Sequence, residues 1–290
     1  MKRCLHCNEV FVSADWVCPA CSFSPPEQDG VHCFAPDLAE LSEGYDPSRY
    51  EAIARFQAEH FWFRGRNELI CSQLKKYFPT ARSLVEIGCG TGQVLQAIRQ
   101  ALPVPGLCGT EIHTRGLAYA KNSLPEIELL QIDARAIPFY EEFDVVSAFD
   151  VIEHVDDDCG VLRQMYQACK PGGGIMLTVP QHRWLWSSKD EIACHKRRYI
   201  REELCAKVRD AGFVVTMVSS FVTVLLPLMY FSRLLHRGNS LGVQHSEFSI
   251  SPLANAVFLA CSRIENAIIR RGGSLPCGGS LILIGQKVMR

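Results

Sequence analysis

The 290-residue chain is long enough for one sizeable domain and a small appendage, because domains commonly hold roughly 100–200 residues. Hydrophobic residues make up 48% of the sequence, which supports a packed core and excludes global disorder. A net charge of −1 excludes a strong overall field that would draw the chain toward nucleic acid.

Two close pairs of cysteines stand near the start of the chain. Cys4 and Cys7 form the first C-x2-C pair, and Cys18 and Cys21 form the second after ten intervening residues. Four thiolates in this pattern suit a tetrahedral Zn²⁺ ion and are typical of a zinc ribbon. We therefore predict a small zinc ribbon over residues 1–30, with a closed ligand set and a structural metal.

Alternatives to this ligand set remain open. His6 or Cys33 could replace one ligand, and the pairs could instead be redox-active, although no thioredoxin-like pattern surrounds them. So small a segment buries little core alone, so the metal would supply its folding energy. The turn-rich segment 24–30 ends the ribbon, and we expect residues 31–45 to be a linker.

The cysteine content also bears on the cellular compartment. The chain holds 14 cysteines, and no long apolar stretch follows residues 1–4, so we expect no signal peptide. Thiols without a secretory signal indicate a reducing compartment with metal-bound or free cysteines. We therefore expect a cytoplasmic enzyme.

Two helices are expected before the main sheet. Asp46-Pro47 combines an N-cap residue with proline at the first helical position, and predicts a helix over 47–59. A second helix is expected over 64–77. The sequence H-F-W-F-R-G-R-N at 60–67 is too aromatic for an ordinary solvated surface. We interpret it either as a helix cap packed on the sheet or as the wall of a substrate site.

From residue 83 the sequence alternates strands and helices, which is typical of a parallel doubly wound sheet. The expected strands are Ser83–Ile87, Cys108–Glu111, Glu128–Gln131, Phe143–Phe149, Gly174–Thr178, Phe213–Ser219 and Ser280–Gln286. The expected helices between them are Gly92–Leu102, Arg115–Asn122, Asp157–Cys169 and Arg201–Ala211. A long apolar and helical insertion, residues 221–277 with an amphipathic helix at 253–271, separates the last two strands.

The most informative motif follows the first of these strands. Gly88, Gly90 and Gly92 form a turn into the next helix, and Glu86 stands two positions before them. Glycines let the backbone bend sharply and approach a ligand, which then faces the free N–H groups of the helix N-terminus. Gln93 stands where a dinucleotide fingerprint has its third glycine. The turn is therefore a nucleotide-type cradle.

This E-x-G-x-G-x-G arrangement resembles motif I of class I S-adenosylmethionine-dependent methyltransferases. The resemblance covers about residues 46–290. It implies an α/β fold with a seven-stranded Rossmann-like methyltransferase sheet, helices on both faces and an antiparallel last strand. In that family the loop lies along the methionine part of the cofactor. The resemblance thus implies that Glu86, Gly88, Gly90 and Gly92 contact S-adenosylmethionine.

Later motifs extend the resemblance. Glu111 ends the second strand and can accept hydrogen bonds from both ribose hydroxyls, a role that would serve NAD equally well. Asp133 and Ala134 resemble the family's D-A motif beside adenine, and Phe149 and Asp150 lie in a run that resembles its motif IV. Because ligands bind outside the carboxyl ends of strands in open α/β sheets, we expect these residues to converge on one cofactor crevice.

Methyl transfer to a hydroxyl would use a general base, which contributes about 10²–10⁴ in rate. His154 is the first candidate because it follows the fourth strand, with Glu153 orienting its ring. His182, after the fifth strand, is the second candidate. Either histidine could instead be a loop residue without a catalytic role.

Two segments resemble one branch of the methyltransferase superfamily, namely residues 60–67 and the H-x-R-R-Y segment at 195–199. On this basis we expect acceptor contacts from Phe61, Trp62, Arg64, His195, Arg198 and Tyr199. The basic residues would suit an anionic or sugar-phosphate acceptor. The alternative is a plain run of charges at the entry to a helix.

An uncharged stretch of 18 residues runs from Val214 to Phe231. Its length is near the lower limit for a membrane span, but its first half alternates like a strand. We expect an apolar loop or helix through 228–235 after that strand. We favour peripheral membrane contact through 221–235, or a lid over an apolar substrate, over a transmembrane helix.

These observations favour an S-adenosylmethionine-dependent methyltransferase that acts on a small-molecule or lipid-linked acceptor. The alternative is an RNA methyltransferase, since zinc ribbons also precede some rRNA methyltransferases. Lys2 and Arg3 are the only cations in the ribbon, which weakens that alternative. A third interpretation, a non-catalytic zinc-dependent binding protein, fits the intact motifs less well.

Overall fold

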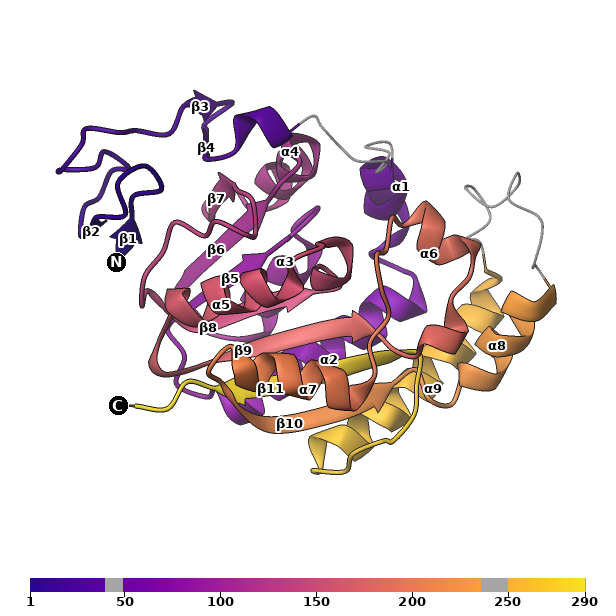
Figure 1. Cartoon of the computed structure of the whole chain (residues 1–290). Coiled ribbons are helices and arrows are strands. Elements are labelled where there is room, and N and C mark those ends of the chain that lie inside the picture. The colour runs from indigo at the N-terminus through magenta and orange to yellow at the C-terminus, as the bar shows by residue number, and fades with distance from the viewer. Residues whose placement is uncertain (40–48, 236–249, 290) are drawn as a thin grey trace.

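A central β-sheet is the main element of the fold (Figure 1). The computed structural model describes residues 1–39, 49–235 and 250–289. In these residues the sheet has nine strands in the order β10-β11-β9-β8-β5-β6-β7-β4-β3. The strands are β3 (Glu27–Gln28), β4 (Val31–Cys33), β5 (Ser83–Ile87), β6 (Gly106–Glu111), β7 (Glu128–Gln131), β8 (Phe143–Phe149), β9 (Cys169–Pro180), β10 (Val214–Phe221) and β11 (Ser280–Gln286).

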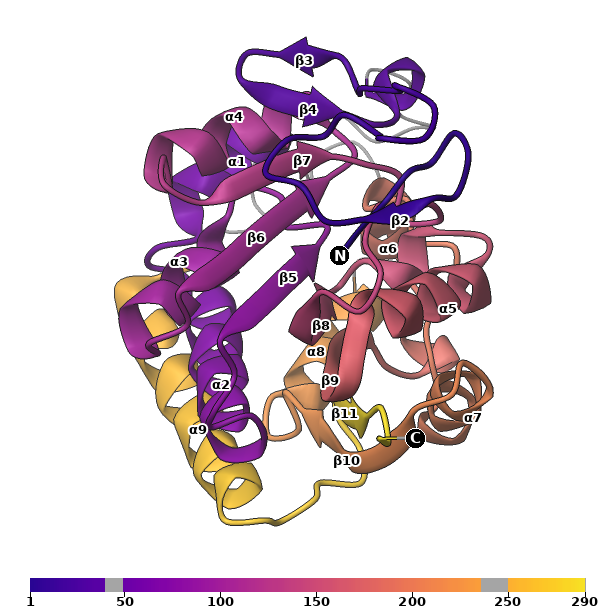
Figure 2. The ribbon, with the colours of Figure 1, turned by 90° about the vertical axis from the view of Figure 1, so that its left-hand side faces the viewer.

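Helices cover both faces of the sheet (Figure 2). The helices are α1 (Arg49–Phe56), α2 (Phe61–Tyr77), α3 (Gln93–Ala101), α4 (Thr114–Ser123), α5 (Asp158–Ala168), α6 (Ser188–Ile192), α7 (Arg201–Asp210), α8 (Leu226–Leu235) and α9 (Pro252–Arg270). Short 3-10 turns are η1 (Pro36–Leu38), η2 (Ile152–His154) and η3 (Arg183–Leu185). Figure 2 shows α2, α3 and α9 on one side of the strands and α5 and α7 on the other.

The alternation of side chains along each strand explains why both faces are covered. In β5, Leu84 joins the apolar cluster that contains residues of α2, α3 and α4, whereas Val85 joins the cluster that contains residues of α5 and α7. Both side chains are buried, as is typical of a parallel strand flanked by two helical layers. The hydrophobic core therefore lies in two layers, one on each side of the sheet.

The expected Rossmann-like methyltransferase sheet is confirmed. β5, β6, β7, β8 and β9 pair in parallel, while β11 runs antiparallel between β9 and β10. The strands β6, β9 and β10 are longer than expected, and α6 was not expected at all. Asp46 and Pro47, where we expected the first helix to begin, lie outside the described residues, and α1 is described from Arg49.

The segment expected as a linker differs in the structure. Val31–Cys33 forms β4, which pairs in parallel with β7, and β3 pairs with β4 in turn. The physical reason is burial, because Val31 and Cys33 both point into the protein. The remaining part of the expected linker, residues 40–45, lies outside the described residues.

The N-terminal segment, including the hairpin of β1 (Lys2–Arg3) and β2 (Val10–Phe11), is docked on the main domain. Trp16 is only 4% exposed and packs edge-on against Phe34 and Phe139, with ring centroids 4.8 and 5.4 Å apart. Its indole nitrogen donates a hydrogen bond to Glu128 at 3.1 Å. This side chain therefore joins the cysteine-bearing segment to the edge of the sheet.

The insertion before β11 folds into α8 and α9 in its described part. α9 lies along α2, where Asn255 accepts a hydrogen bond from the backbone N–H of Phe61 and Arg263 pairs with Glu68. Gly65 permits this close approach, since a Cβ there would lie 2.8 Å from Cβ of Ser262. Within residues 1–39, 49–235 and 250–289, no helix is both long and apolar enough to cross a membrane.

The docking of the N-terminal segment leads to a stability prediction. We expect Trp16→Ala to lower the free energy of unfolding by about 3–5 kcal/mol, because it removes a buried aromatic side chain. Urea denaturation measures this change. Val12→Ala is the matched control, since Val12 is 85% exposed and should change stability little. Equal stability of both variants would contradict the docking.

Candidate functional site

One large cavity opens at the carboxyl ends of β5 to β8 and has a volume of about 1070 Å³. The predicted cofactor residues that line it are Glu86, Gly88, Gly90, Glu111, Asp133, Ala134, Phe149 and Asp150. The predicted acceptor-side residues that line it are Phe61, Trp62, His154, His195 and Arg198. The strand ends thus converge on one crevice, as expected, and α2, α6 and α8 add further walls.

Four predicted site residues are not in this lining. Gly92 is the N-cap residue of α3, with a φ of +78°, and does not line the cavity. Arg64 is exposed on α2. His182 stacks on Trp184, and its Nε2 lies 3.1 Å from Sγ of Cys277. Tyr199, the fourth, is fully buried.

The glycine turn forms a tight cradle at the end of β5. Gly88 has a φ of +71°, and a Cβ at this position would lie 2.5 Å from Cγ2 of Val151. Any side chain at Gly88 would therefore be strained and would clash. The backbone at this position is free to lie directly against a ligand.

Glu111 ties the glycine turn to the end of β6. Its Oε2 accepts a hydrogen bond from the backbone N–H of Gly90 at 2.9 Å, and its Oε1 accepts one from Ile112 at 2.8 Å. Asp133, after β7, accepts hydrogen bonds from the guanidinium of Arg135 at about 3 Å. Both residues line the cavity at the ends of neighbouring strands.

Glu86 is the acid most strongly affected by burial at the cofactor end. Burial raises its pKa to about 8, against the nearby positive charge of Arg66. Its Oε2 has no hydrogen-bond partner among the described residues, although the side chain is only 2% exposed. A buried polar atom without a partner is unusual in a native protein, so this oxygen fits a donor group on a bound ligand.

Arg66 is a site residue that sequence reasoning missed. It lines the cavity, pairs with Asp150 at 2.6 Å, and lies over the ring of Trp62 at 4.5 Å. We chose Arg64 instead, which lies two positions earlier on the same helix. Residues two apart on a helix point to different sides, so only one of these arginines can face the cavity. The R-x-R spacing was the sequence signal that could have pointed to Arg66, because it offers two arginines on different sides of one helix.

The acceptor end of the cavity is built around the buried carboxylate of Asp190. Arg198 Nε lies 2.6 Å from Oδ1 and His195 Nδ1 lies 2.9 Å from the same oxygen. Arg233 of α8 lies 3.6 Å from Oδ2. Although burial opposes it, the hydrogen bond with His195 and the charge of Arg198 lower the pKa of Asp190 to about 2. The carboxylate is therefore ionised and fixes His195 and Arg198 against the cavity.

His154 and Glu153 belong to η2, directly after β8. The rings of His154 and His195 meet edge to face with centroids 4.8 Å apart, so the two predicted residues are brought together. Glu153 is fully buried, and burial, reinforced by the negative charge of Asp150, raises its pKa well above the usual range. The structure thus places two imidazoles and one carboxylate at the same end of the cavity.

Tyr199 corrects our expectation of a substrate contact. The side chain is fully buried, and its hydroxyl donates a hydrogen bond to Asp158 at 2.7 Å. Lys207 and Arg197 also pair with Asp158, so the tyrosine belongs to a buried polar cluster behind the cavity wall.

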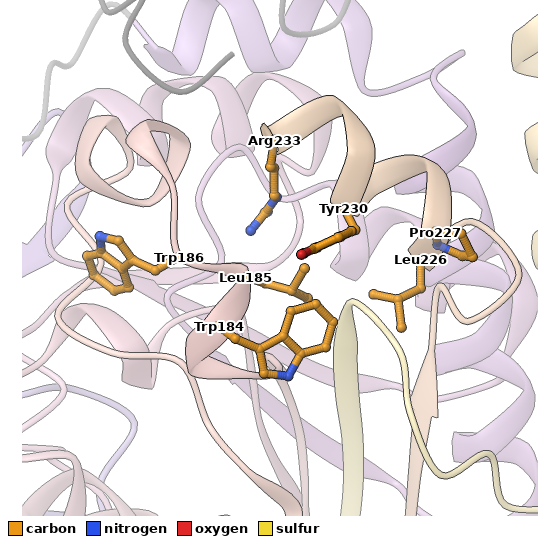
Figure 3. A pocket seen from close by; sticks show the side chains of 7 residues that line it. All are labelled: Trp184, Leu185, Trp186, Leu226, Pro227, Tyr230 and Arg233. Atoms are coloured by element: carbon orange, nitrogen blue, oxygen red, sulfur yellow. The ribbon is translucent and has the colours of Figure 1, made fainter. Parts of the chain in front are cut away.

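A second, shallower hollow of about 600 Å³ adjoins α8 and η3. Figure 3 shows Trp184, Leu185 and Trp186 on one side and Leu226, Pro227 and Tyr230 on the other, with Arg233 pointing between them. Trp184 and Tyr230 remain 53% and 41% exposed. Arg233 lines both this aromatic hollow and the large cavity, so the two spaces are neighbours.

The four N-terminal cysteines are arranged as a zinc site requires. Their sulfur atoms all lie within 4.8 Å of one another, and the Cys4–Cys21 and Cys7–Cys18 sulfur pairs are each 3.6 Å apart. Four thiolates at a Zn–S distance of about 2.3 Å in a tetrahedron lie roughly 3.8 Å apart. His6 and Cys33 are not part of this cluster.

A family model described as a methyltransferase domain matches residues 54–218, which is more than half of the chain. The chain belongs to this methyltransferase family. S-adenosylmethionine is the methyl donor of its relatives, and the glycine cradle with its acids fits that cofactor.

Relatives in sequence are similar over part of this chain. A protein of Mycobacterium tuberculosis named "Probable S-adenosylmethionine-dependent methyltransferase" is 28% identical over 165 residues, which are 56% of this chain and 59% of that protein. A ubiquinone biosynthesis O-methyltransferase of Pseudomonas putida is 32% identical over 104 residues, which are 34% of this chain and 44% of that protein. The chain therefore spans less than two thirds of the length of either relative.

Solved structures are similar in fold. Phosphoethanolamine N-methyltransferase 2 of Haemonchus contortus, in complex with S-adenosylmethionine, has a TM-score of 0.56 at 19% identity, covering 91% of this chain and 62% of that one. The [4+2]-cyclase SpnF has a TM-score of 0.53 at 17% identity, covering 77% of this chain and 81% of that one. At this identity the likeness concerns the fold alone.

The buried polar cluster at Asp158 predicts a pH-dependent contribution to stability. Although burial opposes it, hydrogen bonds from Lys207 and Tyr199 lower the pKa of Asp158 to about 2, below the ordinary value of 3.8. Because this pKa is depressed, the stabilisation is fully present above the ordinary value and is lost as pH falls through the folded-state pKa. We expect Asp158→Asn to lower the free energy of unfolding by roughly 2 kcal/mol at neutral pH.

Urea denaturation at a series of pH values tests this expectation. The difference between the wild type and Asp158→Asn should shrink once the pH falls below the ordinary pKa of an aspartate. Asp156→Asn is the control, since the side chain of Asp156 is 76% exposed. A difference that grew on acidification would have the wrong sign for this interaction.

The cysteine cluster predicts the metal content of the purified protein. We expect about one zinc per chain, and loss of that zinc in Cys18→Ser, because a closed four-thiolate shell needs every ligand. Inductively coupled plasma mass spectrometry measures the content. Cys205→Ser is the control, since Cys205 is a buried thiol of α7 outside this cluster. Full zinc content in Cys18→Ser would refute the ligand set.

Proposed function

We propose that this protein transfers a methyl group from S-adenosylmethionine to a hydroxyl of a small-molecule or lipid-linked acceptor. The proposal rests on the observation that one cavity is lined by both sets of residues. The glycine turn and its acids line one end, and His154, His195 and Arg198 line the other. A donor at the first end and an acceptor at the second would therefore meet inside one enclosure.

The residues at the cofactor end would hold the donor by its polar groups. Glu86 offers its buried Oε2, and Glu111 and Asp133 offer carboxylate oxygens at the ends of β6 and β7. When bound, S-adenosylmethionine supplies a methyl group made electrophilic by its sulfonium. The protein then mainly aligns the reactants, and alignment of this kind is worth about 7–11 kcal/mol.

The residues at the acceptor end would bind the acceptor and help to remove its proton. His154 lies directly after β8, and Arg198 and Arg233 bring positive charge to the same region. Arg66 and Trp62 add a cationic and an aromatic wall from α2. This lining suits an acceptor with an aromatic or anionic head that carries a hydroxyl.

The aromatic hollow supports an acceptor with an apolar part. It is lined by two tryptophans, a tyrosine, two leucines and a proline, and it borders the large cavity at Arg233 (Figure 3). Leu228, Tyr230 and Phe231 on α8 are 53%, 41% and 60% exposed, and the ring centroids of Tyr230 and Phe231 lie 5.9 Å apart. Exposed apolar side chains in a group are typical of contact with lipid or a partner, so we include peripheral membrane contact through 221–235 in the proposal.

The RNA alternative gains no support from the ribbon. Lys2 donates hydrogen bonds to the carbonyls of Ala14 and Asp15 and lies over the ring of Trp16. Arg3 donates to the carbonyl of Ile137 at 2.6 Å. Both cations are engaged within the protein, and phosphate binding would require their release.

Cofactor binding tests the proposal directly. In calorimetry with S-adenosylhomocysteine, we expect Glu111→Ala and Asp133→Ala to weaken binding by roughly tenfold or more, because each removes a charged hydrogen-bond acceptor. Arg64→Ala should leave binding unchanged, because Arg64 is exposed outside the cavity. Absence of binding to the wild type would refute the proposed function.

A separate experiment tests which class of molecule accepts the methyl group. We would incubate the protein with methyl-labelled S-adenosylmethionine and either a bacterial lipid extract, the aqueous small-molecule fraction or total RNA. We expect label in the lipid or small-molecule fraction, and a loss of about 10²-fold or more in His154→Ala, which should keep cofactor affinity. Label confined to RNA would overturn the acceptor class.

A further inference from the structure

Three side chains at the acceptor end form a cluster with the composition of a metal site. Glu153, His154 and His195 each offer one ligand atom, and these atoms all lie within 4.8 Å of one another. Glu153 and His154 are neighbours in η2, while His195 comes from the segment after α6. The backbone N–H of Lys196 donates to the carbonyl of Glu153 at 2.8 Å, which holds the two segments together.

The burial of the Glu153 carboxylate is a second, independent indication of a metal site. The residue is 0% exposed, and neither carboxylate oxygen has a hydrogen-bond partner among the described residues. Burying a carboxylate without such partners is costly, and buried charges are normally paired or bound to a metal. Glu153 and both histidines are among the residues that line the cavity, and one oxygen of Glu153 lies within 4.8 Å of a nitrogen of each imidazole.

His195 is held in the manner of a metal ligand. Its Nδ1 lies 2.9 Å from Oδ1 of Asp190, which leaves Nε2 as the nitrogen able to bind a metal. Metal-binding histidines almost always donate their other ring N–H to a carboxylate or carbonyl, which sets the tautomer and the ring orientation. Asp190 is itself fixed by Arg198 at 2.6 Å and by the backbone N–H of Ser187 at 2.9 Å.

We propose that Glu153, His154 and His195 bind one divalent transition-metal cation such as Mn²⁺, at the acceptor end of the cavity and separate from the cysteine site. One carboxylate and two imidazoles suit Mn²⁺, Fe²⁺, Co²⁺ or Zn²⁺, and three protein ligands leave positions open toward the cavity. These open positions can take an oxygen of the acceptor.

The consequence for methyl transfer rests on the proposed function. A hydroxyl bound to a divalent cation loses its proton to solvent more readily, and its oxygen keeps the electron pair that forms the bond to the methyl carbon. The S–CH₃ bond breaks and its electron pair stays on sulfur, which leaves S-adenosylhomocysteine. His154 then acts as a metal ligand and not as a free base.

Electron paramagnetic resonance of Mn²⁺ tests the site in the full, zinc-loaded protein. Thiolates favour softer ions than Mn²⁺, so the cysteine cluster should keep its zinc during the titration. We expect about one Mn²⁺ per chain in the wild type, and at least about tenfold weaker binding in Glu153→Gln and His195→Gln, with a smaller loss in Asp190→Asn. His182→Gln is the matched control, because His182 lies outside the cavity.

Calorimetry with S-adenosylhomocysteine on each variant checks that the fold is intact. Failure of the wild type to bind Mn²⁺ at millimolar concentration would overturn the metal site, as would unchanged Mn²⁺ binding in a folded Glu153→Gln. Stoichiometric Mn²⁺ binding that depends on these residues supports the site even where no acceptor is methylated. In that case the proposed function fails and the metal site stands.

Discussion

The buried carboxylate of Asp190 is the interaction on which the acceptor side of the cavity depends. It pairs with Arg198 and His195 from the following segment and with Arg233 from α8, a helix far along the chain. Arg198 also donates to the carbonyl of Gln181 at the end of β9, so the sheet is connected to the same cluster. Removing one partner from a buried pair costs about 3–5 kcal/mol, because the remaining charge is left uncompensated. A single buried carboxylate therefore connects the segment after α6 with α8 and, through Arg198, with the end of β9.

The cofactor side of the cavity is held by the sheet. Its groups stand at the ends of parallel strands, where the sheet fixes their positions, and a glycine cradle needs only backbone atoms. The fold also occurs in a protein named for another activity, since a [4+2]-cyclase is similar to this chain in fold. Fold alone therefore does not decide the chemistry.

The difference between the cofactor side and the acceptor side also explains how much could be predicted from the sequence. Strand ends and the glycine turn are local patterns, so the sheet could be predicted, and Gly88 and Glu111 line the cavity as expected, while their contact with a cofactor stays a prediction. Tyr199 was misplaced because its partner, Asp158, lies 41 positions away and no local pattern reveals that bond. The pairing of β4 with β7 is non-local in the same way. Arg66 was missed because the start of α2 was placed three residues late, which left the facing side of the helix undefined.

The position of Arg233 connects acceptor recognition to the stability of the site. Its side chain borders both the large cavity and the aromatic hollow, and it also pairs with Asp190. An acceptor whose head lies near His195 and whose apolar part lies in the hollow would therefore pass this guanidinium. Under the proposed function, substitutions on α8 at the hollow, such as at Leu226 or Tyr230, would change the apolar part that is accepted without disturbing the glycine turn. Changes at Arg233 would instead alter the buried cluster itself, because the side chain that borders both spaces also compensates the charge of Asp190.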